Sequence, residues 1–238
     1  MKCIRIGPGV TGLSIGEKVL GWGLFMAYAD HVLVSPQQIV RKPAGLSWPE
    51  AGVMSASGQT ASTAISALGI AGGDTLLIHA AAGGVGSFGI QIATAMGAHV
   101  IGTASERNHD YLHSLGATPV VYGKGLVERV RAVAPNGVSA ALIAVNTEEA
   151  VRASLELVGQ RERVGAVAFV PLADKLGIRR ISTERSAARL TALLDLYTAG
   201  KLKLHIQETY PLTQAPDAHR VMEAGHVRGK LAFTMGQS

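Results

Sequence analysis

Between residues 46 and 203 the hydrophobic pattern of the chain alternates between two forms. Short apolar runs, typical of strands buried on both faces, are each followed by a longer segment with apolar residues at helical spacing. Strands are expected at residues 76–78, 99–104, 116–122, 139–145 and 163–169. Strands and helices that alternate in this way predict a parallel sheet with right-handed crossovers. We therefore expect an α/β domain with a doubly wound parallel sheet.

The clearest helix start is the sequence Ser47-Trp-Pro-Glu50. Ser47 can cap the helix, Pro49 has a φ angle preset for the first turn, and Glu50 completes a capping box. Small residues continue this helix to Leu68. Further helices are expected at residues 85–96, 106–115, 126–134, 148–158 and 185–199.

The two ends of the chain differ from this middle part. Residues 1–45 contain short extended stretches between glycine and proline turns, with expected strands at 28–34 and 39–43. The tail contains an extended stretch at 204–210, a short helix at 216–224 and a strand at 230–235. We expect the two β-rich ends to pack together. The chain is thus divided into residues 1–45, 46–203 and 204–238.

Composition excludes several functional classes. Hydrophobic residues make up 47% of the 238 residues and charged residues 16%, which indicates a globular protein. The net charge of +5 is spread along the chain without a basic run, so we expect no nucleic-acid partner. Cys3 is the only cysteine, which excludes an intrachain disulfide and a four-cysteine zinc site. No apolar run or signal pattern indicates a membrane, so a cytoplasmic protein is expected.

A glycine-rich turn joins the first expected strand of the sheet to the next helix. It has the sequence Ala80-Ala-Ala-Gly-Gly-Val-Gly86. Small residues let the backbone approach a dinucleotide pyrophosphate, and the free amides at the helix start face the negative charge. The first position of the pattern is Ala81 rather than glycine. The alternative is a plain turn between a core strand and a core helix, but the strand–turn–helix order favours a Rossmann cofactor site.

The end of the second strand bears on the choice of cofactor. An NAD site favours a carboxylate about 20 residues beyond the glycines, where it binds the ribose hydroxyls. Glu106 lies at that distance, but Ser105 and Arg107 beside it suit the 2′-phosphate of NADP. These residues alone leave both cofactors open.

Histidines offer two further possibilities. His109 and His113 are four residues apart on an expected helix, but no third ligand lies nearby, so we interpret them as a solvated face and expect no metal. His79 ends the first strand of the sheet, either in the core or beside the cofactor. No Gly-x-Ser-x-Gly elbow is present, which argues against a hydrolase.

Several motifs in order resemble the medium-chain dehydrogenase/reductase superfamily, in particular its zinc-independent quinone oxidoreductase-like branch. They are Gly7-Pro-Gly-Val, Gly16-Glu-Lys-Val, Tyr28-Ala-Asp-His-Val, Gly58-Gln-Thr-Ala, the glycine turn, Gly116-Ala and Val227-Arg-Gly-Lys230. The resemblance covers nearly the whole chain. It implies a Rossmann domain beside a GroES-like catalytic domain, and NADPH-dependent reduction of a quinone or an activated C=C bond by hydride transfer.

The resemblance also implies a cofactor site made of Thr60, Ala82, Gly83, Gly84, Val85, Gly86, Ser105, Arg107, Tyr122, Asn146, Phe169 and Val170. The turn residues would bind the pyrophosphate, and Tyr122 with Arg107 would bind the 2′-phosphate, which favours NADPH. Thr60 and Phe169 would lie beside the nicotinamide. The alternatives are structural: Thr60 bonded to a helix carbonyl, Tyr122 as an ordinary strand-end residue, and Phe169 in the core.

The chain departs from the family pattern in two places. It lacks a counterpart of the early part of the GroES-like domain, so we expect a truncated catalytic domain and an open cofactor cleft. Residues 142–146 are Leu-Ile-Ala-Val-Asn, where relatives have an aspartate and a glycine. Ile143 thus replaces an acid, and Asn146 replaces a flexible residue beside the cofactor.

Three hypotheses follow for the activity. The chain is an NADPH-dependent reductase whose cleft a partner or the substrate completes, a repurposed cyclase or isomerase, or a non-catalytic NADPH-binding protein. The resemblance implies a small-molecule substrate and a homodimer. Trp22, Tyr28 and Thr60 are pocket candidates for a proton donor, but none is convincing, so the catalytic residue stays unassigned.

Overall fold

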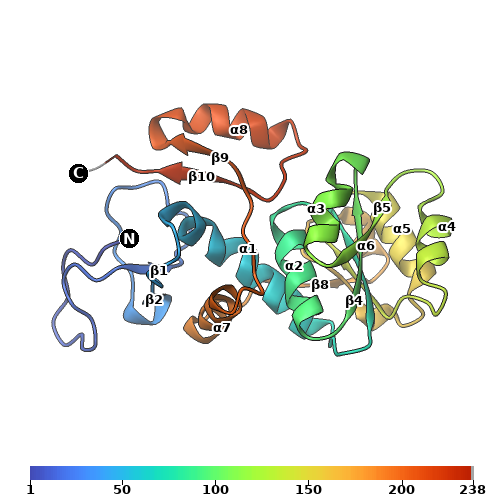
Figure 1. Cartoon of the computed structure of the whole chain (residues 1–238), viewed down its shortest axis with the longest axis horizontal. Coiled ribbons are helices and arrows are strands. Elements are labelled where there is room, and N and C mark those ends of the chain that lie inside the picture. The colour runs from blue at the N-terminus through green and yellow to red at the C-terminus, as the bar shows by residue number, and fades with distance from the viewer. Residues whose placement is uncertain (237–238) are drawn as a thin grey trace.

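Six parallel strands form the main sheet of this computed structural model, which describes residues 1–236 (Figure 1). The strands lie in the order β5-β4-β3-β6-β7-β8. Their bounds are β3 Thr75–His79, β4 His99–Ala104, β5 Ala117–Val121, β6 Ala140–Ile143, β7 Val164–Ala166 and β8 Arg179–Arg180. The order reverses between β3 and β6, and a crevice for a ligand forms at the carboxyl ends of the strands at such a point. The predicted doubly wound parallel sheet is confirmed.

Helices cover both faces of the sheet. One face carries α1 (Trp48–Ala67), α2 (Gly84–Ala95) and α3 (His109–Ser114), and α7 (Ala187–Thr198) packs against α1. The other face carries α4 (Leu126–Val133), α5 (Glu148–Leu157) and α6 (Pro171–Lys175). Strand β3 shows why both faces are apolar: Leu76 and Ile78 pack on the first face, and Leu77 packs on the second. No helix among residues 1–236 is long and apolar enough to cross a membrane.

Helix α1 begins as the capping box predicted. The Ser47 hydroxyl accepts a hydrogen bond from the Glu50 amide, and the Glu50 carboxylate accepts one from the Ser47 amide. The helix runs antiparallel to the strands, because its last turn meets the amino ends of the sheet: the guanidinium of Arg179 donates to the carbonyl of Ala67 (2.8 Å). The middle of α1 therefore lies beside the carboxyl ends, where a cofactor is expected.

The tail forms a small unit that returns to the sheet. Strands β9 (Ile206–Pro211) and β10 (Lys230–Thr234) pair in parallel, and η4 (Leu212–Gln214) and α8 (Ala215–Glu223) connect them. The side chain of Gln91 in α2 holds the start of this tail, since it donates to the carbonyl of Lys203 (3.0 Å) and accepts from its amide (2.7 Å). These two hydrogen bonds fix the tail beside α2.

The amino-terminal segment has less regular structure than predicted. Only β1 (Val19–Gly21) and β2 (Ile39–Arg41) are strands, and they pair with each other; η1 (Pro36–Gln38) precedes β2. The strand predicted at 28–34 is wrong, because that segment finds no neighbouring strand to satisfy its backbone. Its first side chain, Tyr28, contacts the tail instead.

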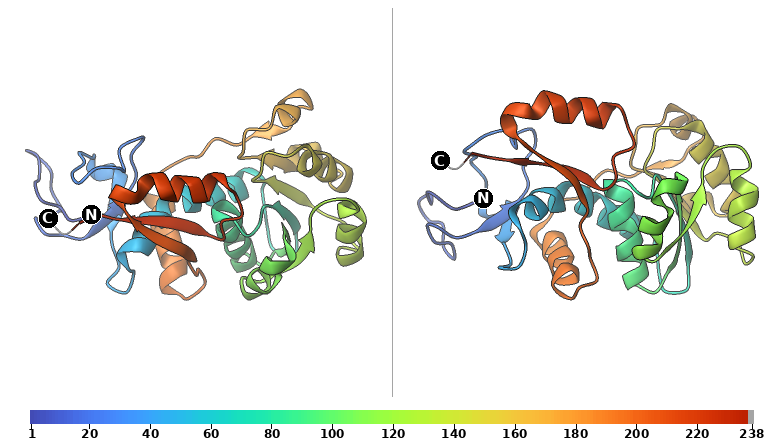
Figure 2. Two further views of the ribbon diagram at one scale, coloured as in Figure 1. Left: turned by 90° about the horizontal axis from the view of Figure 1, so that it is seen from above. Right: turned by 45° about the horizontal axis from the view of Figure 1, so that its top comes forward.

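Tyr28 joins the two chain ends. Its hydroxyl lies 3.0 Å from Nε2 of His219 in α8, and its ring packs edge-on against Phe233 of β10 at a centroid distance of 5.0 Å. The two ends lie together at the side of the molecule opposite the main sheet (Figure 2). They form two separate two-stranded sheets, rather than one.

Two elements of the sheet domain are not predicted by its sequence pattern. Strand β8 consists of two arginines at the edge of the sheet, and charged residues are typical of edge strands. Helix α6 has only five residues and begins at Pro171. The predicted helix at 106–115 is divided into a 3₁₀ turn, η2 (Glu106–Asn108), and α3.

Candidate cofactor site

The glycine-rich turn lies between β3 and α2, at the reversal point of the sheet. The backbone turns at Ala80, whose φ is +56°, and α2 begins after Gly83 as its cap residue. The amide of Ala81 donates to the carbonyl of Thr103 in β4 (3.0 Å), which fixes the turn against the neighbouring strand. Among residues 1–236 no hydrogen bond is found to the amides of Gly84, Val85 and Gly86. These three amides and the positive end of the α2 dipole suit an anion.

Close packing explains the small residues of the turn. A Cβ atom on Gly86 would lie 2.5 Å from the carbonyl oxygen of Ala80. A Cβ on Gly84 would lie 2.6 Å from Cδ of Lys230 and 2.7 Å from Oγ of Ser57. Glycine is therefore required at both positions, because neighbouring atoms already occupy the space that a Cβ atom would need.

The alanine at the first position of the pattern has a local explanation. Ala81 is completely buried, and its methyl group lies 2.7 Å from the point where a Cβ on Gly102 would be. The absence of a side chain at Gly102 in β4 therefore makes room for the methyl group of Ala81. The turn keeps its shape despite the departure from the glycine pattern.

Ser105, Arg107 and Tyr122 follow two neighbouring strands, as the sequence predicts. Ala104 is paired with Val121, so the residues after β4 and β5 meet at one edge of the sheet. Arg107 also lines a cavity of about 460 Å³ with Asn108, His205, Gln207, Gly225, His226 and Arg228. Two guanidinium groups and no carboxylate line this cavity, and Glu106 is exposed outside it. Such a cavity suits a phosphate better than a ribose diol.

Arg228 is a cavity residue that sequence reasoning missed. Its Nε donates to Oδ1 of Asn108 (2.8 Å), its Nη2 donates to the carbonyl of Arg107 (2.9 Å), and its guanidinium stacks 5.4 Å from the ring of Tyr111. Burial lowers the pKa of His205, and the positive charge of Arg228 lowers it further. The signal available in the sequence was the motif Arg-Gly-Lys at 228–230, whose position beside β4 only the fold reveals.

Lys230 lies across the first turn of α2. Its side chain packs against Gly84, beside the hydroxyl of Ser57 in α1, and burial lowers its pKa. No hydrogen bond to its ammonium group is found among residues 1–236. A cation without an acidic partner beside the positive end of a helix is an unfavourable arrangement unless an anion lies there. Lys230 therefore adds to the anion-binding character of the turn.

The remaining predicted residues lie on the other side of the reversal point. Asn146 follows β6 and is exposed, and Phe169 follows β7 with its ring 5.0 Å from the guanidinium of Arg180. Phe169 is 56% exposed and so is not a core residue. The side chain of Val170 is 3% exposed and packs in the core, which leaves only its backbone to line a site.

Thr60 is half-buried in the middle of α1. Its hydroxyl lies 2.8 Å from the carbonyl oxygen of Ala56, as the structural alternative predicted. The same hydroxyl lies 2.8 Å from the hydroxyl of Thr183, a residue beyond the end of β8. The structure thus adds a partner to Thr60 that the sequence did not suggest.

In the described part of the chain, the histidines considered from the sequence do not form a metal site, and His79 lies in the core. His79 is almost fully buried, its Nε2 lies 3.0 Å from Oγ of Ser154 in α5, and burial lowers its pKa to about 4. Its side chain is therefore a neutral core group that packs against α5, although its backbone directly precedes the glycine turn. Within the described range, 1–236, no three His, Cys, Asp or Glu side chains lie where they could hold a metal ion.

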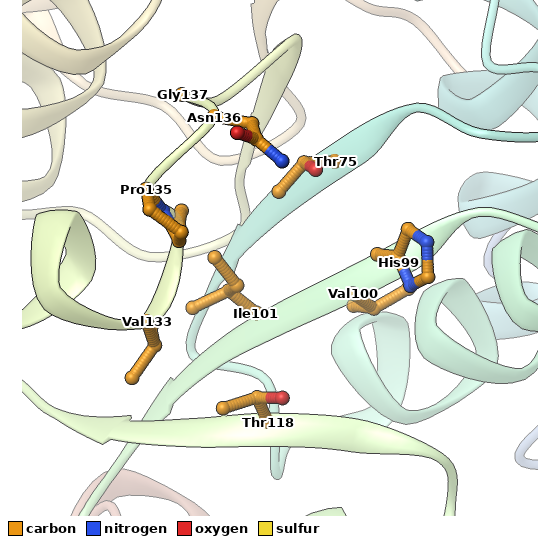
Figure 3. A pocket seen from close by; sticks show the side chains of 10 residues that line it. Thr75, His99, Val100, Ile101, Thr118, Val133, Pro135, Asn136 and Gly137 are labelled. Atoms are coloured by element: carbon orange, nitrogen blue, oxygen red, sulfur yellow. The ribbon is translucent and has the colours of Figure 1, made fainter.

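A second cavity, of about 210 Å³, lies at the opposite edge of the sheet (Figure 3). Thr75 and His99, the first residues of β3 and β4, line it together with the turn Pro135–Gly137. Ligands of such sheets bind at the carboxyl ends of the strands, so this cavity at the amino ends is not the cofactor site.

Comparisons with known proteins agree with this Rossmann-type architecture. The sequence model of the family described as zinc-binding dehydrogenase matches residues 115–232. The spectinabilin polyketide synthase system protein NorB of Streptomyces orinoci is 30% identical over 97% of this chain, which spans 11% of that protein. A quinone oxidoreductase of Pseudomonas aeruginosa is 28% identical over 94% of the chain and 76% of its own length.

The solved structure of the quinone oxidoreductase from Coxiella burnetii matches with a TM-score of 0.85 and 31% identity. The match covers 98% of this chain and 76% of that one. The chain belongs to the medium-chain dehydrogenase/reductase superfamily, among its quinone oxidoreductase-like members.

Proposed function

We propose that the protein is an NADPH-dependent oxidoreductase that reduces a quinone or an activated C=C bond. The observation that carries the proposal is the group of three free amides at the start of α2 beside Lys230, with the cavity of Arg107 and Arg228 next to it. The relatives named as quinone oxidoreductases support the reaction type. The motifs of this chain that resemble the zinc-independent branch of the family support a reaction without zinc.

The residues present fit the proposed cofactor. The amides of Gly84, Val85 and Gly86 and the ammonium of Lys230 would bind the pyrophosphate. Arg107, with Ser105 and Tyr122 nearby, would bind the 2′-phosphate. Thr60, Asn146, Phe169 and the backbone of Val170 would line the nicotinamide side. When bound, the reduced nicotinamide would supply the hydride.

The remaining task of the chain is to place the acceptor and to polarise its oxygen, which needs no protein nucleophile. Fluorescence titration with NADPH, followed by turnover of a quinone and an enone, tests the proposal. Absence of NADPH binding would contradict it and favour a repurposed cyclase or isomerase. Binding without NADPH oxidation by either acceptor would indicate the non-catalytic alternative.

We also propose that the protein is cytoplasmic and that it forms a homodimer. The second subunit, or another partner, would close the cofactor cleft. Large apolar side chains on the amino-terminal segment support a partner: Ile15, Leu24, Phe25 and Leu33 are exposed. The two-residue edge strand β8 leaves one edge of the main sheet open for pairing. Light scattering tests this proposal, and a monomer at all concentrations would contradict it.

A further inference from the structure

The loop between β8 and α7 is attached to the middle of α1 by a series of polar side chains. The hydroxyl of Thr63 accepts from the amide of Glu184 (3.1 Å), and Oε1 of Gln59 accepts from the amide of Ser186 (2.8 Å). Both contacts satisfy loop amides with helix side chains, so their role is structural. They hold the loop residue Thr183 at a fixed place against the helix.

The contact between Thr60 and Thr183 differs from these attachments, because it joins two side-chain hydroxyls 2.8 Å apart. Each hydroxyl has one proton and two lone pairs. Thr60 can give its proton to the carbonyl of Ala56 or to Thr183. In the second arrangement Thr183 receives a hydrogen bond, and its own proton is free to reach a third oxygen.

The position of this pair is close to the cofactor turn. Ser57, one helical turn before Thr60 on the same side of α1, lies beside Gly84 at the start of α2. Thr183 comes three residues after β8, which ends at the carboxyl edge of the sheet. Thr60 and Thr183 are both half-buried, so the pair is partly exposed at this end of the sheet and partly shielded from water.

We propose that Thr183 is a catalytic residue that donates a hydrogen bond to the acceptor oxygen, with Thr60 as its positioning residue. This inference rests on the proposed reductase function. As hydride reaches the acceptor carbon, electrons of its C=C or C=O bond move to the acceptor oxygen, and negative charge grows there. A donor aimed at that oxygen stabilises the charge, and a proton from water completes the reduction.

The Thr60–Thr183 pair suits this task because hydrogen bonds in a chain polarise one another. When Thr183 donates to the acceptor, Thr60 rotates its proton from Ala56 to Thr183. The loss at Ala56 is small, since that carbonyl also accepts the ordinary bond of the helix backbone. The pair therefore strengthens its donor without breaking the helix.

Binding of an oxyanion tests the proposal without turnover. The probe is 4-nitrophenolate, whose absorbance changes on binding, titrated with and without NADP⁺. We expect Thr183→Val and Thr183→Ala to raise its dissociation constant about tenfold, and Thr60→Val to raise it about threefold. Thr183→Ser and Thr60→Ser should bind the probe as the wild type does. The double variant Thr60→Val with Thr183→Val should bind it no more weakly than Thr183→Val alone.

Ser182→Ala is the matched control, since it removes an exposed hydroxyl from the same loop. Its dissociation constant for the probe should equal that of the wild type. An unchanged constant in both Thr183 variants, or no binding of the probe to the wild type in either condition, would overturn the proposal. NADPH titration of the wild type is independent of these outcomes, and its failure would instead contradict the proposed function.

Discussion

The amide of Gly229 donates a hydrogen bond to the carbonyl oxygen of Ala82 over 2.8 Å. This bond joins the tail of the chain directly to the glycine-rich turn, which lies more than 140 residues earlier in the sequence. Gly229 has a φ of +63°, and a Cβ there would lie 2.2 Å from the carbonyl oxygen of His205. The position thus requires glycine, and its neighbours Arg228 and Lys230 contact Asn108 and Gly84 respectively.

Gly229→Ala should destabilise the protein and weaken NADPH binding. The left-handed backbone and the overlap with His205 together predict a loss of about 2–4 kcal/mol in the free energy of unfolding. Urea unfolding and NADPH titration measure the two effects. Gly225→Ala is the control: its φ is +76° but no atom lies within 4 Å of its Cβ position, so it should lose only about 1–2 kcal/mol. Equal losses of unfolding free energy in the two variants would contradict this account.

Lys230→Met should weaken the binding of NADPH and of NADH to the same extent. The ammonium group lies near the start of α2, where the pyrophosphate common to both cofactors would bind, so we expect each dissociation constant to rise about tenfold. Cofactor fluorescence measures both constants. Lys175→Met removes the same charge from an exposed position of α6 and should leave them unchanged. A loss confined to NADPH would place Lys230 at the 2′-phosphate instead.

His79 should make the protein less stable in acid. Its pKa is about 4 in the folded chain against 6.5 as the ordinary value, so the unfolded chain takes up a proton that the folded chain refuses. The stability is complete above pH 6.5 and falls by about 3 kcal/mol as the pH drops to 4.

His79→Leu tests this dependence, because leucine fills the site without titrating. The difference in unfolding free energy between wild type and variant, measured by urea titration across this pH range, should change in favour of the variant as the pH falls. A difference that stays constant with pH would show that His79 does not contribute.

The sheet domain could be predicted largely from its sequence because its strands are short apolar runs buried by helices on both faces. Strand β8 escaped prediction, since Arg179 and Arg180 pair at the edge without an apolar pattern. The segment 28–34 has the alternation of a strand, but pairing depends on a neighbouring strand, which a local pattern does not reveal. Local patterns thus succeed where burial alone determines the element.

The candidate site shows the same division. The glycine turn is local in sequence, and the structure has it between β3 and α2 as predicted. Arg228, Lys230 and Thr183 reach the site through tertiary contacts, which no spacing in the sequence encodes. The interpretation of Thr60 changed for the same reason, because its second hydroxyl partner lies 123 residues away.

The central claim is that the turn binds NADPH and that Arg107 selects it through the 2′-phosphate. The most direct measurement compares the dissociation constants of NADPH and NADH for wild type and Arg107→Gln. We expect the wild type to bind NADPH at least about tenfold more tightly, and the variant to lose about tenfold for NADPH and nothing for NADH. Tighter binding of NADH by the wild type, or equal losses for both cofactors in the variant, would contradict the claim.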